Sequence, residues 1–115
     1  MTTATYREVD QFYADAEATK AAEQAVTAMM LKHGSELPYC GFAWISYPER
    51  IRKNSQTAKA LAAIGFTWND YYKRMQKRSP YSGQSMDFAE ASCQAYVAKF
   101  AELTGLKLNV SSRAD

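Results

Sequence analysis

The 115-residue sequence lacks the residues that most metal and nucleophile sites need. It contains one histidine, His33, and two cysteines, Cys40 and Cys93, which form no CxxC pair. A zinc site takes three or four such ligands, so we expect no metal. No P-loop, GxGxxG or HxxxH motif occurs, and neither cysteine has a histidine partner in the sequence. We therefore expect neither a catalytic residue nor a cofactor.

Long apolar runs are also missing. No stretch reaches about 18 apolar residues, the length that crosses a membrane. Residues 1–24 are polar and acidic, whereas a signal peptide has a basic start and an apolar middle. We expect a cytoplasmic protein that has no membrane partner and keeps its cysteines buried and reduced. The content of 47% apolar and 23% charged residues indicates one globular domain, 1–115.

The N-terminal part is predicted to be helical. Residues 4–33 carry no Gly or Pro, and their apolar residues recur at helical spacing. One long helix, or two with a kink, should end at Gly34, leaving 39–115 as an α/β core. Between Ala21 and Met30 the apolar residues are numerous enough to predict self-association.

The segment 40–47, CGFAWISY, alternates as a strand does. Phe42 and Trp44 should share one face with Cys40, whereas the small Gly41 and Ala43 should let a helix approach the other face. The strand is predicted to be central. We expect it to be buried between layers.

The rest of the chain predicts alternating short elements. Gly65 should end a helix at 55–64, Asn69-Asp70 should turn a short strand or hairpin, and Asp87 with Glu90 should cap a last helix that Gly105 ends. A strand at 106–110 and a polar tail, 111–115, follow. The order α-β-α-β-α-β predicts an α/β or α+β fold, a small mixed sheet covered by helices.

Basic charge is concentrated in residues 50–78. This segment has eight basic residues and one acidic residue, a net charge of +7, whereas the remainder has six basic and eleven acidic residues, a net charge of −5. Arg50 and Arg52 belong to it, and aromatic residues lie within it. Because aromatic rings stack on bases and arginines fork onto phosphates, the pattern favours a phosphate-bearing partner over a merely solvated surface. A small nucleotide and a nucleic acid are both candidates.

The stretch 81–87, YSGQSMD, places polar groups where the last helix begins. A helix N-terminus favours anions, so Gln84 and Ser85 are candidates to hold a ribose, base or phosphate, with Tyr81 stacked beside them. The alternative is structural: Ser85 and Asp87 cap, and Tyr81 packs.

Three pieces of the sequence, YCGFAW (39–44), YSGQSMD (81–87) and the ending SSRAD (111–115), together resemble the phage Thoeris anti-defence proteins of the first type. The similar pieces span residues 39–115. Proteins of that family sequester a cyclic ADP-ribose isomer made by a bacterial TIR enzyme. Departures at Ser82, Ser111 and Ala114 leave the ligand open.

The resemblance implies a sponge, a homo-oligomer that binds a cyclic nucleotide without cleaving it in an infected bacterial cell. Some members also hold cyclic di- or trinucleotides. It implies that Phe42 and Trp44 lie in or beneath the pocket, that Gln84 and Ser85 contact polar ligand groups, and that Arg113 contacts a phosphate.

Overall fold

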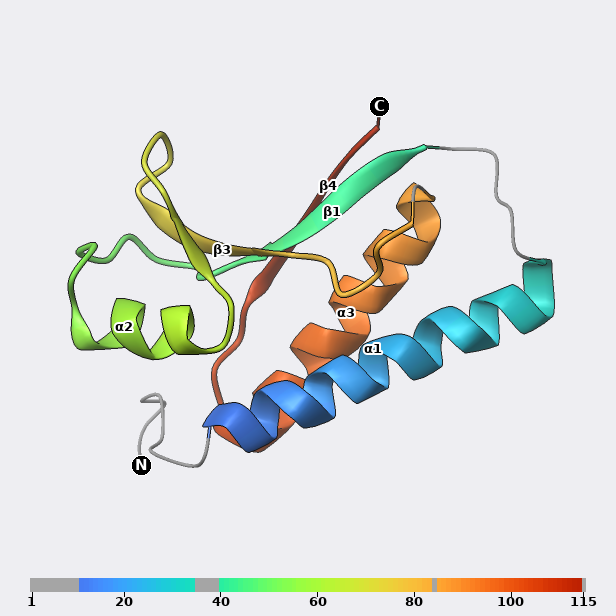
Figure 1. Cartoon of the computed structure of the whole chain (residues 1–115), viewed down its shortest axis with the longest axis horizontal. Coiled ribbons are helices and arrows are strands. Elements are labelled where there is room, and N and C mark those ends of the chain that lie inside the picture. Colours follow the sequence, from blue (N-terminus) through green and yellow to red (C-terminus); the bar gives the residue numbers. More distant parts are fainter. Residues whose placement is uncertain (1–10, 35–39, 84, 115) are drawn as a thin grey trace.

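A computed structural model describes residues 11–34, 40–83 and 85–114 (Figure 1). Within these residues three helices and four strands follow one another. In order they are α1 (Gln11–His33), β1 (Gly41–Ser46), α2 (Gln56–Ala63), β2 (Thr67–Asn69), β3 (Arg74–Arg78), α3 (Met86–Thr104) and β4 (Asn109–Ala114).

The four strands form one sheet in the order β2-β3-β1-β4, and every pair of neighbours is antiparallel. The fold class and the central position of β1 are confirmed, but the sheet that was predicted to be mixed has only antiparallel neighbours. From β1 onward the order is β-α-β-β-α-β, the ferredoxin-like arrangement. The long helix α1 precedes this unit.

All three helices cover the same face of the sheet. Helix α3 lies against β1 and β4, α2 against β2 and β3, and α1 along α3 (Figure 1). The contact face of α1 is a stripe of small side chains, which lets the two helices approach closely: Ala14, Ala18, Ala22 and Val26. Since Ala22 and Val26 are buried within the chain, much of the apolar surface that predicted self-association has an intramolecular use.

Strand β1 shows the predicted division of faces, but the prediction that it is buried between layers is wrong, because the described helices cover only one of its faces. Gly41, Ala43 and Ile45 are buried towards the helices, whereas Phe42 is exposed and Trp44 is partly exposed. No described helix covers the face that carries Phe42 and Trp44, and we call it the open face (Figure 1).

Three local predictions need correction. The N-cap of α3 is Ser85, whose hydroxyl oxygen accepts the Phe88 N–H, and Asp87 instead lies in the first turn. The last strand begins at Asn109, so residues 111–114, predicted to be a tail, extend the sheet. Cys40 is exposed, whereas Cys93 is buried, and burial raises the pKa of its thiol to about 12.

One cation joins the helices beneath the sheet. The Nζ of Lys77 donates to the Ile64 carbonyl at 2.6 Å, where α2 ends, and to Asp15 of α1 at 3.3 Å. The Tyr96 hydroxyl of α3 donates to the same Asp15 oxygen at 2.5 Å. The ammonium also lies 5.9 Å from the Phe66 ring centre and 5.6 Å from that of Tyr96. With only 18% and 25% of the Lys77 and Asp15 side chains exposed, water screens this pair weakly.

Replacing Asp15 with Ala should lower the free energy of unfolding by about 2–3 kcal/mol, because Lys77 and Tyr96 lose the acceptor that they share. Chemical denaturation measures the change. Glu102→Ala, which removes the exposed Lys99–Glu102 pair, is the matched control and should cost at most about 0.5 kcal/mol. Equal losses in the two variants would contradict a central role for Asp15.

Candidate functional site

The open face combines aromatic rings with arginines. In the antiparallel register Phe42 lies opposite Arg113, and Trp44 lies opposite Arg78 and Ser111. Residues directly opposite each other project from the same face of a sheet. By this register the open-face positions hold three arginines and no acidic residue: Phe42, Trp44, Ser46, Thr67, Asn69, Arg74, Gln76, Arg78, Asn109, Ser111 and Arg113.

The aromatic pair at the end of this face is accessible to a ligand. The Phe42 side chain is 44% exposed, and its ring centre lies 6.3 Å from that of Trp44. An exposed ring offers a stacking surface for a nucleobase, and an arginine on a neighbouring strand offers a two-pronged donor for phosphate. Arg78 and Arg113 flank the pair on β3 and β4. Of these arginines, sequence reasoning proposed only Arg113 as a ligand contact, because the place of Arg78 depends on the register.

A pocket adjoins Phe42 because β3 is shorter than β1. The last contact between these strands is the Ser79 N–H bond to the Ala43 carbonyl at 3.1 Å, and the chain next meets β1 through the bridge between Cys40 and Ser85. Between these two contacts the segment that follows β3 does not pair with β1. The resulting cavity of about 240 Å³ is lined by Phe42, Ala43, Arg78, Ser79, Tyr81, Ser82, Gly83 and Ala89.

The YSGQSMD stretch shapes this pocket through packing as well as polarity. The Tyr81 ring meets the Phe88 ring edge to face at 5.6 Å, and a Cβ at Gly83 would lie 2.1 Å from the Tyr81 hydroxyl oxygen. Only glycine leaves room for that ring position. Ser85 is buried and its hydroxyl oxygen caps α3, so the structural role predicted as the alternative is present. Gln84 lies outside the described residues.

The end of β4 lies beside the start of α3. Strand β4 is antiparallel to β1, and its end reaches the site because Ala114 pairs with Gly41. A Cβ at Gly41 would lie 2.5 Å from the Arg113 carbonyl oxygen and 3.0 Å from the Met86 Cβ. Because Gly41 has no side chain, β4 and α3 can both approach β1 closely at this position.

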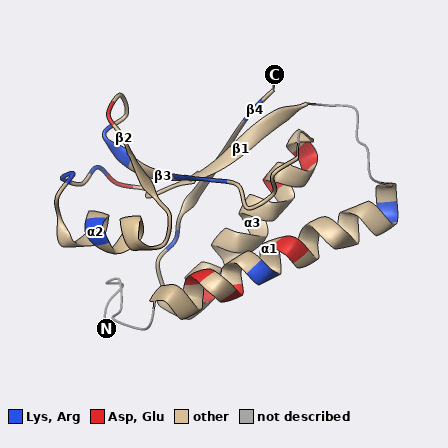
Figure 2. Cartoon of the chain, in the orientation of Figure 1, with Lys and Arg blue, Asp and Glu red and all other residues tan. Residues whose placement is uncertain are grey.

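Arg50 and Arg52 lie away from this pocket. They follow the opposite end of β1, and the strand from Gly41 to Ser46 spans about 17 Å. Figure 2 shows basic residues in the loop before α2 and along β3, while acidic residues gather on α1 and α3. The predicted site residues thus divide, with Phe42, Trp44, Tyr81, Ser85 and Arg113 at one end of the sheet and the two loop arginines at the other.

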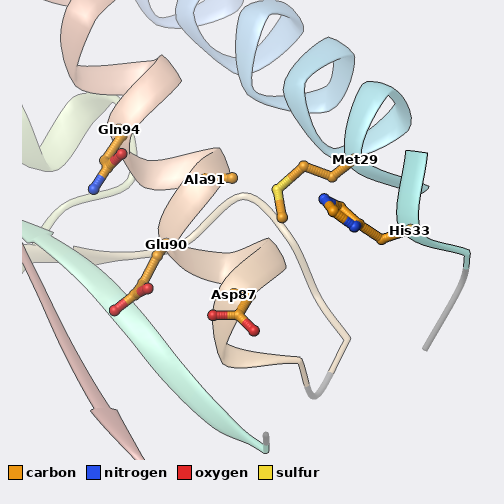
Figure 3. A pocket seen from close by; sticks show the side chains of 6 residues that line it. All are labelled: Met29, His33, Asp87, Glu90, Ala91 and Gln94. Carbon is orange, nitrogen blue, oxygen red and sulfur yellow. The ribbon is translucent and has the colours of Figure 1, made fainter. Parts of the chain in front are cut away.

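A second groove, between α1 and α3, has the wrong charge for a phosphate. Its volume is about 370 Å³, and it is lined by Met29 and His33 of α1 and by Asp87, Glu90, Ala91 and Gln94 of α3. The Glu90 carboxylate points away from α1 (Figure 3) and accepts a hydrogen bond from the Ser112 hydroxyl of β4. The two carboxylates would repel an anion.

Among the described residues no three His, Cys, Asp or Glu side chains are grouped to hold a metal ion. None of the described helices is both long enough and apolar enough to cross a membrane.

Gly41→Ala should destabilise the protein by about 1–3 kcal/mol, because the new methyl group meets backbone atoms of β4 that cannot rotate away. Thermal melting measures this. Ser111→Ala on the same sheet is the control and should change stability by less than about 0.5 kcal/mol. An unchanged melting temperature for Gly41→Ala would show that β4 does not pair with β1 at this position.

Comparisons with known proteins found no relative of this chain. No family model, curated protein or solved structure matches the chain. The resemblance to the phage anti-defence family stays a prediction, and the chemistry of the open face carries the functional argument.

Proposed function

We propose that the open face binds a nucleotide and holds it without chemical change. One observation carries the proposal: an exposed aromatic ring, Phe42, lies opposite Arg113 and next to a pocket that Arg78 and Tyr81 also line. A nucleotide-binding site needs an aromatic ring on which the base can stack and an N–H donor group, such as a guanidinium, that can bind the phosphate.

The arrangement suggests how the ligand would lie. Its base stacks on Phe42 or enters the pocket beside Tyr81. Its phosphate oxygens accept hydrogen bonds from the guanidinium of Arg78 or Arg113. The open-face positions carry no carboxylate that would repel the phosphate. Because the site is exposed, salt should weaken the phosphate contacts more than the stacking.

The residue types on this face favour binding over catalysis. None of its paired positions holds a histidine, aspartate or glutamate that would act as a base on a bound ligand. The exposed thiol of Cys40, just before β1, has none of these groups beside it at the paired positions. The Cys93 thiol is buried on α3, and its raised pKa keeps it protonated.

The resemblance supplies the specific form of the proposal. In that form the protein is a homo-oligomeric phage counter-defence protein that sequesters a cyclic nucleotide immune signal, a cyclic ADP-ribose isomer or a cyclic di- or trinucleotide, in the cytoplasm of the infected host. Phe42, Tyr81 and Arg113, which the resemblance or the sequence proposed as contacts, lie at the same end of the sheet, and this supports it. Arg50 and Arg52 are not part of this site.

Phe42→Ala and Arg113→Ala should each weaken nucleotide binding about tenfold or more, since one removes the stacking ring and the other a charge-assisted contact. Calorimetry measures the affinities with the nucleotide that most raises the melting temperature in a panel of cyclic ADP-ribose isomers, cyclic di- and trinucleotides and mononucleotides. A ligand at a hundred times its dissociation constant adds about 2.7 kcal/mol of stability, so the panel is sensitive.

Lys20→Ala on α1 is the control, because it removes an exposed positive charge from the helical side of the molecule. It should leave the affinity unchanged. If Phe42→Ala and Arg113→Ala bind as tightly as this control, the open face is not the site.

A further inference from the structure

The polar side chains of β3 form a row along the open face. Arg74, Gln76 and Arg78 occupy alternate positions, which places them on one face at steps of about 7 Å. The intervening Met75 is buried, and Lys77 binds Asp15 beneath the sheet. The row therefore leads from the pocket at Phe42 towards the β2–β3 hairpin tip, a distance of about 14 Å from Arg78 to Arg74.

The hairpin tip at the other end of this row presents two more aromatic rings. Tyr71 and Tyr72 are 85% and 55% exposed, and their ring centres lie 4.8 Å apart, edge to face. Large exposed aromatic side chains that fill no core are typical of binding surfaces.

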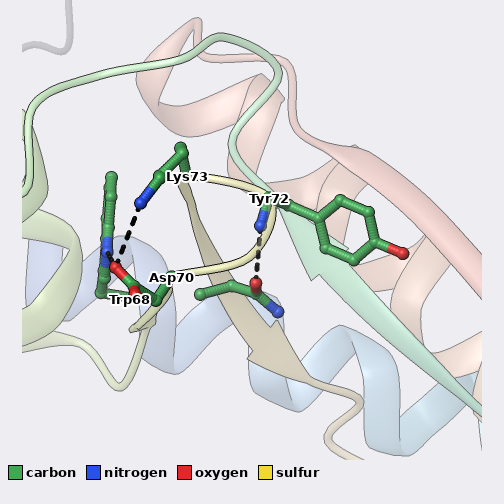
Figure 4. A network of polar contacts seen from close by, with 5 residues as sticks. Trp68, Asp70, Tyr72 and Lys73 are labelled. Atoms are coloured by element: carbon green, nitrogen blue, oxygen red, sulfur yellow. Dashed lines mark hydrogen bonds and ion pairs between the residues drawn. The ribbon is translucent and has the colours of Figure 1, made fainter.

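Polar contacts link the residues of this tip to one another (Figure 4). Asp70 accepts the indole N–H of Trp68 at 3.2 Å and pairs with Lys73 at 3.4 Å, while the Asn69 side chain accepts the Tyr72 N–H at 2.9 Å. Hydrogen bonds from Trp68 and Lys73 lower the pKa of the Asp70 carboxyl, and the positive charge of Lys73 and that of Lys53 lower it further.

We infer that the open face binds a single-stranded nucleic acid along β3, with one base at Phe42, the backbone over the Arg74–Arg78 row and further bases at the Tyr71–Tyr72 tip. Charge complementarity selects this occupant, because the paired strand positions of the face carry arginines on β3 and β4 and no acidic residue, and Lys73 pairs with the one carboxylate at the tip, Asp70. Stacking surfaces separated by a basic row suit a strand of several nucleotides, since every base has a stacking face and every linkage a charge. The inference rests on the proposed nucleotide site at Phe42 and extends it to a polymer.

A length series tests the inference. Fluorescence anisotropy should show labelled oligothymidylates binding progressively tighter from about two to eight nucleotides, and tighter than thymidine monophosphate. An oligouridylate series shows whether ribose is preferred to deoxyribose. Arg74→Gln should reduce the slope of log affinity against log salt by about 0.7, the value for one phosphate contact to a single strand, and Tyr71→Ala should weaken the octamer roughly 5- to 150-fold.

The mononucleotide separates this inference from the proposed function. Arg74→Gln and Tyr71→Ala should leave its affinity unchanged, whereas Phe42→Ala should weaken it. Lys20→Gln, which loses a charge on α1, should change neither ligand. If length adds no affinity and Arg74→Gln behaves as Lys20→Gln does, the nucleic-acid track is wrong while a Phe42 nucleotide site stands. If no nucleotide or oligonucleotide binds, both are wrong.

Discussion

The Lys77 ammonium is the constraint that orders this fold. It meets the end of α2 through the Ile64 carbonyl and α1 through Asp15, and Asp15 in turn accepts from Tyr96 of α3. Three helices are therefore tied to one point beneath β3. Because side chains alternate along a strand, turning Lys77 inward turns Gln76 and Arg78 outward. The interaction that holds the helices on one face thus also selects the residues that the other face presents.

Two further features convert this exposed sheet into a site. Strand β3 ends before β1 does, which opens the pocket beside Phe42, and Gly41 lets the end of β4 approach α3. Together they place the pocket, the aromatic pair and Arg113 at one end of a positively charged surface, while the carboxylates of α1 and α3 lie on the helical side (Figure 2).

Local patterns predicted the elements well, whereas long-range pairing decided the site. The alternation of residues 41–46, the helix ends at Gly65 and Gly105 and the turn at Asn69 all depend on neighbours in sequence, and the structure contains them. The inward turn of Lys77 depends on Asp15, 62 positions away, so the sequence pattern alone counts its charge among the basic residues of 50–78 that favour a phosphate-bearing partner. Likewise, the place of Arg113 depends on its register with Phe42. The sequence could not decide between Ser85 and Asp87 as the N-cap of α3, because both residue types suit that position.

The most direct test of the account is to map where a nucleotide binds. Amide chemical shifts can be followed by NMR during titration with an oligothymidylate and, separately, with cyclic ADP-ribose. The account predicts that changes concentrate on the open-face strands, at residues 42–44, 76–78 and 111–113, and in the 79–83 segment beside the pocket. The oligothymidylate should also shift residues 71–74 at the hairpin tip. Changes confined to the groove between α1 and α3, around Met29, His33 and Asp87, would contradict it, because that groove carries the opposite charge.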